Sequence, residues 1–365
     1  MNILQISSAS SFGGGERYVA DLTNALLVRG HDVYVAVRPG SPLPRHLSLS
    51  REKILTLPLR NALDVQSAHE LERIVRRKQI DVIHAHMARD YSLASYAARR
   101  NRQTKFIATR HVLFKLNRLH RHTLARATRV IAVSQAVARE LRASQIVSDN
   151  QIVVISNGID VERFSKTCVG LDRESYLRSI HLPVDGRLVG SIGELRTLKR
   201  HDDFIRAAAL IAKRFPETNF VLAGVDTSKS AEVRRQLERL VIELDLTKRL
   251  HFLGWLDDAE KLLCVMDVFV SASETESFGL AIVEAMAAAT AVVATATEGA
   301  REVIEDQKTG VLVPIGDVKR IAESVINLLS DPEKRRTIAT QSAQSAAKKF
   351  SLRRMVDEIE KIYFN

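Results

Sequence analysis

Residues 2–37 read NILQISSASSFGGGERYVADLTNALLVRGHDVYVAV and combine two kinds of hydrophobic spacing. The runs NILQIS and VYVAV are short and apolar and are bounded by polar or glycine residues, which is typical of buried strands. The stretch between them, GERYVADLTNALLVRG, repeats its apolar residues at helical spacing. A strand, a helix and a second strand in this order predict a βαβ unit with two parallel strands in one sheet.

The same alternation recurs along the chain. It continues through IDVIHAH, KFIAT, RVIAV and QIVVIS, lapses in a polar segment near Asn157, and resumes with RLVGSIG, NFVLAG, LHFLG, DVFVSAS, AVVATAT and GVLVP. Two such series predict an α/β chain of two doubly wound parallel-sheet domains. We expect an N-terminal domain over residues 1–165 and a C-terminal domain over residues 166–349, followed by a helix near residues 350–365.

The composition is that of a globular protein. The chain has 365 residues, of which 45% are hydrophobic and 27% charged, and this length suits about two domains. The uncharged stretch 285–297 has 13 residues, fewer than the ~18 needed to span a bilayer. Residues 1–10 contain no basic segment of the kind that begins a signal peptide. The two cysteines are too few for a disulfide framework and lack metal-binding spacing, so we expect a cytoplasmic protein.

The positive charge is concentrated in the first half of the chain. The net charge is +11, with +12 over residues 1–165 and −1 over residues 166–365. Residues 91–139 contain no carboxylate and eleven cations: Arg99, Arg100, Arg102, Lys105, Arg110, Lys115, Arg118, Arg121, Arg126, Arg129 and Arg139. This asymmetry predicts an anionic partner for the first half, although a charged, solvated face is the alternative.

The most specific motif is ETESFGLAIVEAMA at residues 274–287, directly after the strand DVFVSAS. Four residues lie where a helix starts, so that their amides can face a phosphate: Ser277, Phe278, Gly279 and Leu280. Glu284 lies on that helix, where its carboxylate can accept hydrogen bonds from ribose hydroxyls. Glu276 stays on the loop, near whatever is attached to the phosphate.

Three further features follow predicted strands. Gly13, Gly14 and Gly15 follow the first strand and permit close approach of a ligand, or form a flexible turn. Arg196 and Lys199 follow RLVGSIG and can neutralise a departing diphosphate, or are solvated. His111 follows KFIAT and can orient or polarise a hydroxyl nucleophile, or is structural. We interpret His84 and His86 as a structural pair, since no third metal ligand is indicated.

Taken in order, several segments resemble the retaining glycosyltransferases of family 4, which have the GT-B fold. These segments are GGGE at 13–16, VIAVSQAVAREL at 130–141, ISNGIDVERF at 155–164, GELRTLKRHDDF at 193–204, HFLGW at 251–255, ETESFGLAIVEAMA at 274–287, EGAREVI at 298–304 and TGVLVP at 309–314. The resemblance implies two Rossmann-like domains facing across a cleft, with the final helix packing back on the N-terminal domain. It also implies a nucleotide-sugar donor in the C-terminal domain and an acceptor in the N-terminal one.

The resemblance further implies a role for each candidate residue. Glu284 would bind the donor ribose, Phe278 to Leu280 the diphosphate, and Glu276 the transferred sugar. Two cations, Lys199 and Arg196, would stabilise the leaving phosphate. Gly14 and Gly15 would close over the phosphate, and His111 would lie beside the sugar and the acceptor. No metal or other cofactor is expected, and no Asp-x-Asp triplet occurs.

The sequence departs from the family pattern at two positions. Glu194 stands where the family usually has Arg, and Arg196 follows two places later. Either Arg196 reaches the phosphate from a shifted position or Lys199 acts largely alone. Glu298 stands where a glycine is common, which leaves Gly299 and Glu302 as the matched positions.

The expected function is transfer of a hexose-type sugar from a nucleotide diphosphate to an acceptor hydroxyl, with retention. The acceptor would be a lipid-linked, lipopolysaccharide or other cell-envelope glycan, reached by peripheral contact with the anionic cytoplasmic face of the inner membrane. One alternative is a GT-B sugar-nucleotide epimerase. Another is a basic nucleic-acid-binding protein, against which the basic stretch has few aromatic residues and none in a recognised stacking motif.

Overall fold

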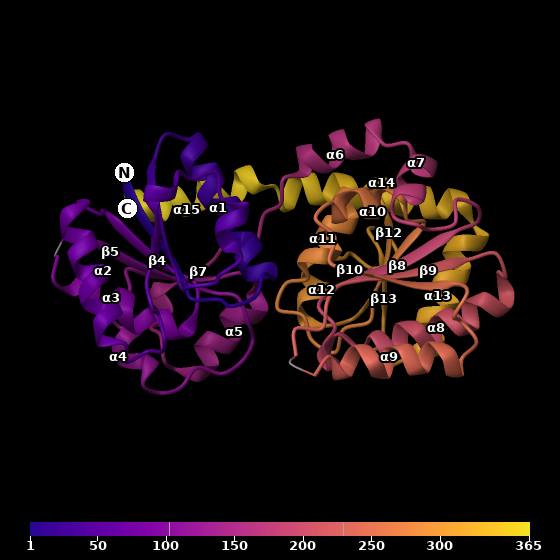
Figure 1. Ribbon diagram of the computed structural model, residues 1–365, viewed down its shortest axis with the longest axis horizontal. Coiled ribbons are helices and arrows are strands. Elements are labelled where there is room, and N and C mark those ends of the chain that lie inside the picture. The colour runs from indigo at the N-terminus through magenta and orange to yellow at the C-terminus, as the bar shows by residue number, and fades with distance from the viewer. Residues whose placement is uncertain (102, 229) are drawn as a thin grey trace. The chain divides into compact units, whose positions relative to one another are not determined.

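The computed structural model describes residues 1–101, 103–228 and 230–365 and divides into two compact units (Figure 1). Unit 1 comprises Met1–Gly158 together with Leu352–Asn365, and unit 2 comprises Ile159–Ser351. Each unit contains one sheet in which all strand pairs are parallel, with helices as the connections. The predicted α/β class with two parallel sheets is therefore confirmed. Arg102, one of the eleven cations of the basic stretch, lies outside the described residues.

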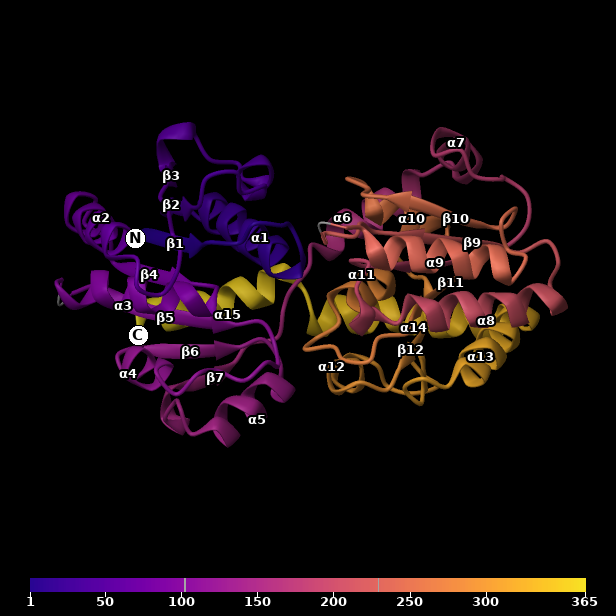
Figure 2. The same ribbon diagram turned by 60° about the horizontal axis from the view of Figure 1, so that its bottom comes forward.

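Unit 1 has a seven-stranded sheet of order β3-β2-β1-β4-β5-β6-β7, which can be followed in Figure 2. Its strands are β1 (Asn2–Ser7), β2 (Asp32–Val37), β3 (Ile54–Thr56), β4 (Val82–Ala85), β5 (Lys105–Arg110), β6 (Arg129–Ala132) and β7 (Ile152–Val154). Its helices are α1 (Gly14–Val28), α2 (Val65–Arg77), α3 (Tyr91–Arg99), α4 (His120–Leu124), α5 (Gln135–Ser144) and α15 (Leu352–Phe364). The strand order reverses between β1 and β4, so the loops after β1 and β4 meet at a switch point.

Helix α15 comes from the far end of the chain and completes the core of unit 1. It lies alongside α1 (Figure 1), and its Met355 and Ile359 are fully buried against the strands. Its outer face is held by ion pairs of Glu360 with Arg29 and, at 2.8 Å, with His31. Lys105 Nζ donates to the carbonyls of the last two helical residues, at 2.9 and 3.1 Å, where a cation also favours the helix dipole. One cation of the basic stretch thus has a structural partner.

Unit 2 has a six-stranded sheet of order β10-β9-β8-β11-β12-β13. Its strands are β8 (Leu188–Ile192), β9 (Asn219–Ala223), β10 (Leu250–Gly254), β11 (Val268–Ser271), β12 (Ala291–Thr295) and β13 (Val311–Val313). Its helices are α6 (Val161–Gly170), α7 (Arg173–Ser179), α8 (His201–Arg214), α9 (Glu232–Glu243), α10 (Ala259–Val265), α11 (Leu280–Ala287), α12 (Glu298–Val303), α13 (Val318–Ser330) and α14 (Pro332–Lys349). Here the order reverses between β8 and β11.

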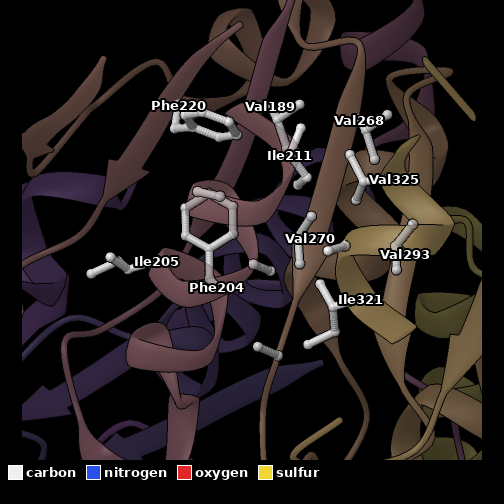
Figure 3. Close-up of a cluster of buried hydrophobic side chains, with 14 of the residues drawn as sticks. Val189, Phe204, Ile205, Ile211, Phe220, Val268, Val270, Val293, Ile321 and Val325 are labelled. Atoms are coloured by element: carbon white, nitrogen blue, oxygen red, sulfur yellow. The ribbon is translucent and has the colours of Figure 1, made fainter. Parts of the chain in front are cut away.

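The core of unit 2 forms between this sheet and helices α8 and α13. Figure 3 shows Phe204 of α8 beside Phe220 of β9 and Val189 of β8 beside Ile211 of α8, with valines of β11 and β12 near Ile321 and Val325 of α13. Phe204 and Phe220 meet edge to face at 6.5 Å, a favoured geometry for buried aromatic rings. The strand runs read as continuous hydrophobic segments because helices shield them from water.

Short polar side chains start many of the helices. At each of these helix starts the side-chain oxygen accepts a hydrogen bond from the backbone N–H three residues later, which satisfies one otherwise unpaired amide. The capping residues are Asp64, Ser134, Asp160, Thr297, Asp317 and Asp331. These caps define the helix boundaries locally, before any tertiary contact forms.

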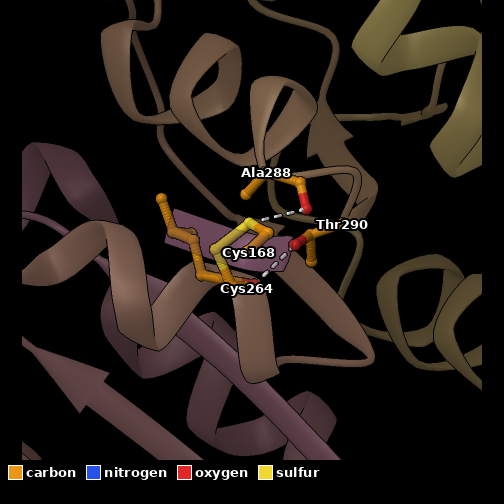
Figure 4. Close-up of a disulfide and its surroundings, with 5 residues drawn as sticks. Cys168, Cys264, Ala288 and Thr290 are labelled. Carbon is orange, nitrogen blue, oxygen red and sulfur yellow. Dashed lines mark hydrogen bonds between the residues drawn. A yellow bond between two sulfur atoms is a disulfide. The ribbon is translucent and has the colours of Figure 1, made fainter. Parts of the chain in front are cut away.

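The two cysteines form one disulfide, between Cys168 of α6 and Cys264 of α10 (Figure 4). The pair lies beside Ala288, whose carbonyl oxygen is 3.6 Å from the Sγ of Cys168. Two cysteines are too few for a disulfide framework, and their spacing in the sequence did not predict that they pair. The structure corrects this: packing of α6 on α10 brings together residues 96 positions apart.

Reduction of this disulfide should destabilise the protein. Closure of a 96-residue loop restricts the unfolded chain, and cross-links of this kind contribute about 2–4 kcal/mol. We expect urea unfolding of the wild type to shift to lower denaturant when dithiothreitol is added. The double variant Cys168→Ser/Cys264→Ser should unfold at the reduced midpoint with or without reductant. An unchanged wild-type midpoint under reduction would contradict the prediction.

Candidate functional site

In unit 2, two loops meet at the carboxyl edge of the central strands β8 and β11. One loop follows β8 and leads into α8, and the other follows β11 and leads into α11. They are joined by a hydrogen bond from the backbone N–H of Glu274 to the carbonyl of Leu198, at 2.9 Å. Since the strand order reverses here, this is the position where open parallel sheets bind ligands.

Lys199 and Glu276 form an ion pair between these loops. The Nζ of Lys199 is 2.6 Å from Oε1 of Glu276, and the same oxygen accepts a hydrogen bond from the Ser273 hydroxyl at 2.8 Å. The Glu276 side chain is 14% exposed, so solvent screens this pair less than one on the open surface. The ammonium group is thereby held in place before any ligand binds.

Helix α11 begins beside this pair. Its N-cap is Gly279, with φ of +93°, a left-handed conformation that favours glycine. Phe278 is 2% exposed and packs edge to face on Phe350 at 5.5 Å, so its ring anchors the loop and its backbone faces the helix start. The first turn of a helix leaves backbone N–H groups without partners inside the helix, which attract an anion. Glu284 lies in the second turn of α11.

Gly299 allows α12 to approach the same loop. Its N–H donates to the carbonyl of Glu276 at 3.0 Å. A Cβ at this position would lie 2.7 Å from both that carbonyl oxygen and the N of Phe278, so any larger residue would displace the loop. Gly299, singled out in the sequence only as a matched family position, thus supports the loop that carries Glu276.

Arg196 takes a different position from Lys199. Its side chain is 57% exposed and pairs with Glu194 at 3.5 Å. Glu194 also accepts a hydrogen bond from the Thr227 hydroxyl. The structure therefore brings together Lys199, Glu276 and the start of α11, while the partner of Arg196 is Glu194.

His201 is a neighbour that sequence reasoning missed. It is the first residue of α8, is 4% exposed, and its Nε2 hydrogen-bonds to the carbonyl of Glu194 at 3.1 Å. Burial lowers its pKa to about 4, so the ring is neutral near pH 7. The sequence did contain a hint that His201 belongs to this site, because His201 follows Arg196 and Lys199 in the segment after β8.

In unit 1, His111 lies beside the glycine-rich loop. A Cβ on Gly15 would be 3.9 Å from Cγ of His111, and the His111 ring meets that of Tyr18 edge to face at 4.8 Å. Burial, followed by the nearby Arg110 charge, lowers the His111 pKa to about 3. The ring is therefore neutral near pH 7 and acts as a hydrogen-bonding group. Gly14 begins α1, whose N-cap Gly13 donates its N–H to Glu16 at 3.1 Å.

His84 and His86 are both buried in unit 1. Both ring nitrogens of His84 and the Nε2 of His86 are hydrogen-bonded to neighbouring side chains. Among the described residues, no group of three or more His, Cys, Asp or Glu side chains is arranged to hold a metal ion. Asp90, also missed in the sequence, is fully buried nearby and accepts a hydrogen bond from the N–H of Ser8 at 2.9 Å. Burial raises its pKa to about 6.

Both units match known families. Residues 12–163 match the model of glycosyltransferase family 4, and residues 172–345 match the model of the glycosyl transferases group 1. The chain belongs to glycosyltransferase family 4. The expected family is therefore confirmed, and with it the expected enzyme class, a glycosyltransferase.

Relatives of this glycosyltransferase extend over almost the whole chain. It is 26% identical to the N-acetyl-alpha-D-glucosaminyl L-malate synthase of Bacillus anthracis, over 99% of this chain and 96% of that protein. It is 29% identical to the lipopolysaccharide core biosynthesis glycosyltransferase LpsE of Rhizobium meliloti, over 94% of each. The structure of Anabaena Alr3699/HepE, solved in complex with UDP and glucose, superposes with a TM-score of 0.85 at 21% identity, covering 99% of this chain and 98% of that one. The fold is that of the GT-B glycosyltransferases.

In residues 1–101, 103–228 and 230–365, none of the helices combines the length and the apolar character needed to cross a bilayer.

Lys199 and Arg196 should contribute unequally to glycosyl transfer. Because Lys199 is held by Glu276 beside α11, we expect Lys199→Ala to lower kcat by about 100-fold or more, the usual cost of removing a preorganised charge stabiliser. Arg196→Ala should lower kcat less than about tenfold, since Arg196 is exposed and pairs with Glu194. Initial rates of sugar transfer would measure both. Equal losses in the two variants would contradict the prediction.

Proposed function

We propose that this family 4 glycosyltransferase moves a hexose-type sugar from a nucleoside diphosphate to an acceptor hydroxyl, with retention of the anomeric configuration. The observation that carries the donor assignment is the Lys199–Glu276 pair beside the start of α11, at the switch point of the second sheet. The Anabaena relative bound to UDP and glucose supports a donor of this class. The product belongs to a cell-envelope glycan, as the lipopolysaccharide relative suggests.

The residues on the donor side each contact a different part of the nucleotide sugar. The backbone from Ser277 to Leu280 receives the diphosphate at the helix N-terminus, and Glu284 accepts hydrogen bonds from the ribose. Lys199 neutralises the negative charge that develops on the departing phosphate. Glu276 binds hydroxyls of the transferred sugar while it keeps Lys199 in position. The mechanism uses no metal or added cofactor.

On the acceptor side, His111 orients the attacking hydroxyl. A neutral imidazole donates through one ring nitrogen and accepts through the other, so it directs a hydroxyl without adding positive charge. Gly14 and Gly15 lack side chains, and a Cβ on Gly15 would lie 3.9 Å from Cγ of His111, so a ligand can approach the backbone beside this ring. These roles agree with the positions of the three residues in unit 1.

The basic stretch supports an anionic or lipid-linked acceptor and a peripheral position on the cytoplasmic face of the inner membrane. Between β5 and α4 it exposes three large apolar side chains, Val112 at 38%, Phe114 at 61% and Leu119 at 72%. Four exposed cations accompany them: Lys115, Arg118, Arg121 and Arg126. Apolar side chains that enter the headgroup region, with cations that meet anionic lipids, are the combination expected of an interfacial contact.

A thermal-shift screen tests the donor. We expect one nucleoside diphosphate, or its sugar, among UDP, GDP and ADP forms to raise the Tm equally with and without EDTA, because ligand binding to the native state stabilises it. Glu284→Ala should lose the shift, while the exposed control Glu243→Ala keeps it. No shift with any of these compounds, in a folded protein, would overturn the donor site. Conversion of the donor sugar without acceptor would instead indicate an epimerase.

Vesicle binding tests the membrane contact. Arg118, Arg121 and Arg126 replaced together by Gln should weaken binding to vesicles of phosphatidylglycerol and phosphatidylcholine, since each cation near an anionic surface contributes on the order of 1 kcal/mol. The matched control changes Arg206, Lys213 and Arg214, exposed cations of α8 and its end, to Gln. Equal binding of wild type, triple variant and control in vesicle sedimentation would contradict this part of the proposal.

A further inference from the structure

A continuous chain of hydrogen bonds runs through the core of unit 1, from the C-terminal helix to His111. Tyr363, in the last turn of α15, is fully buried and its hydroxyl lies 2.6 Å from Nδ1 of His84 and 3.3 Å from the amide nitrogen of Gln5. The amide oxygen of Gln5 is 2.6 Å from Nε2 of His86. The other nitrogen of His86, Nδ1, is 3.4 Å from Nε2 of His111.

With the Gln5 amide oriented as it is in the structure, its two ends set the direction of the hydrogen bonds on either side of it. Its oxygen only accepts, so His86 must donate from Nε2 and its Nδ1 must be an acceptor. His111 therefore donates from Nε2 to His86. On the other side, the amide nitrogen of Gln5 only donates, so the Tyr363 hydroxyl accepts from it and gives its own hydrogen to Nδ1 of His84.

The series of hydrogen bonds ends at the Thr109 hydroxyl, which can accept a hydrogen bond from His84. His84, with Nδ1 used as an acceptor, donates from Nε2 to the Thr109 hydroxyl at 2.6 Å. All three imidazole rings are neutral near pH 7, because burial lowers the pKa values of His84, His86 and His111 far below neutrality. Each imidazole then has one N–H and one lone pair, and the position of one hydrogen specifies the next.

We propose that Gln5 is a positioning residue that, with Tyr363 accepting from its amide nitrogen, acts through His86 to hold His111 in the Nε2–H tautomer and leaves the His111 Nδ1 as a hydrogen-bond acceptor. The acceptor nitrogen is the one suited to receive a hydrogen bond from a substrate hydroxyl, and this consequence rests on the proposed function. The prediction of the tautomer itself does not depend on the proposed function. The last helical turn thus contributes, through Tyr363, to the hydrogen-bonded network of a side chain that lies 252 positions earlier in the sequence.

Replacement of Tyr363 should release this control. In Tyr363→Phe the amide nitrogen of Gln5 loses its acceptor, so the amide is free to rotate and to present its NH2 group to His86. His86 and His111 then adopt both tautomers. Gln5→Met removes the amide while keeping an unbranched side chain, and it should have the same effect on His111 without changing α15.

The test is the ¹⁵N spectrum of histidine-labelled protein, in which long-range ¹⁵N–¹H correlations distinguish Nε2–H from Nδ1–H rings. The His111 signals are assigned by their absence in His111→Gln. We expect a single Nε2–H form in the wild type and a mixture in Tyr363→Phe and Gln5→Met. Tyr91→Phe is the matched control: it removes a buried hydroxyl that donates to the Thr109 carbonyl at 2.7 Å, outside the chain, and His111 should keep the wild-type form.

An Nδ1–H form of His111 in the wild type would overturn the proposal. So would a His111 that stays Nε2–H in folded Tyr363→Phe and Gln5→Met. A kinetic reading follows if the transferase activity is as proposed: with half of the molecules in the wrong tautomer, the KM for the acceptor rises about twofold and that for the donor does not change. The spectrum is recorded without donor or acceptor. The tautomer can therefore be tested even if the proposed function is wrong.

Discussion

Parallel strands can be joined only by crossover connections, and this constraint arranges both units. Each helix returns the chain to the start of the next strand, so every loop that follows a strand lies at the same edge of its sheet. The strand order reverses between β1 and β4 in unit 1 and between β8 and β11 in unit 2. Open parallel sheets bind ligands at such places, and Lys199 and Glu276 follow β8 and β11, whereas His111 follows β5, the neighbour of β4.

The site in unit 2 combines charge with backbone geometry. Lys199 and Glu276 come from different loops and are separated by 77 positions, yet they meet at 2.6 Å because β8 and β11 are neighbours. The loop that carries Glu276 is fixed by the buried Phe278 ring and by the close approach of the Gly299 backbone. A cation, a carboxylate and a helix N-terminus are thereby fixed together before substrate arrives, which is the arrangement that electrostatic catalysis requires.

The site in unit 1 depends on the end of the chain. Helix α15 supplies Met355 and Ile359 to the core, and its last turn places Tyr363 between Gln5 and His84. The polar residues at the carboxyl ends of β1 and β4 are therefore part of the folding of unit 1 as well as neighbours of His111. A truncation that removed α15 would expose the apolar core and remove the Tyr363 hydroxyl that Gln5 and His84 contact.

The amino-acid sequence by itself determined the strand and helix series, the α/β class and the placement of the candidate residues after strands, because hydrophobic spacing and capping are local properties. Its distinctive ETESFG segment also indicated the family. Only the tertiary structure decided the pairing of Lys199 with Glu276, the exposed position of Arg196, the disulfide of Cys168 with Cys264 and the chain from Tyr363 to His111. Each of these joins side chains through the register of neighbouring strands or the packing of distant helices, and no local spacing in the sequence encodes such a contact.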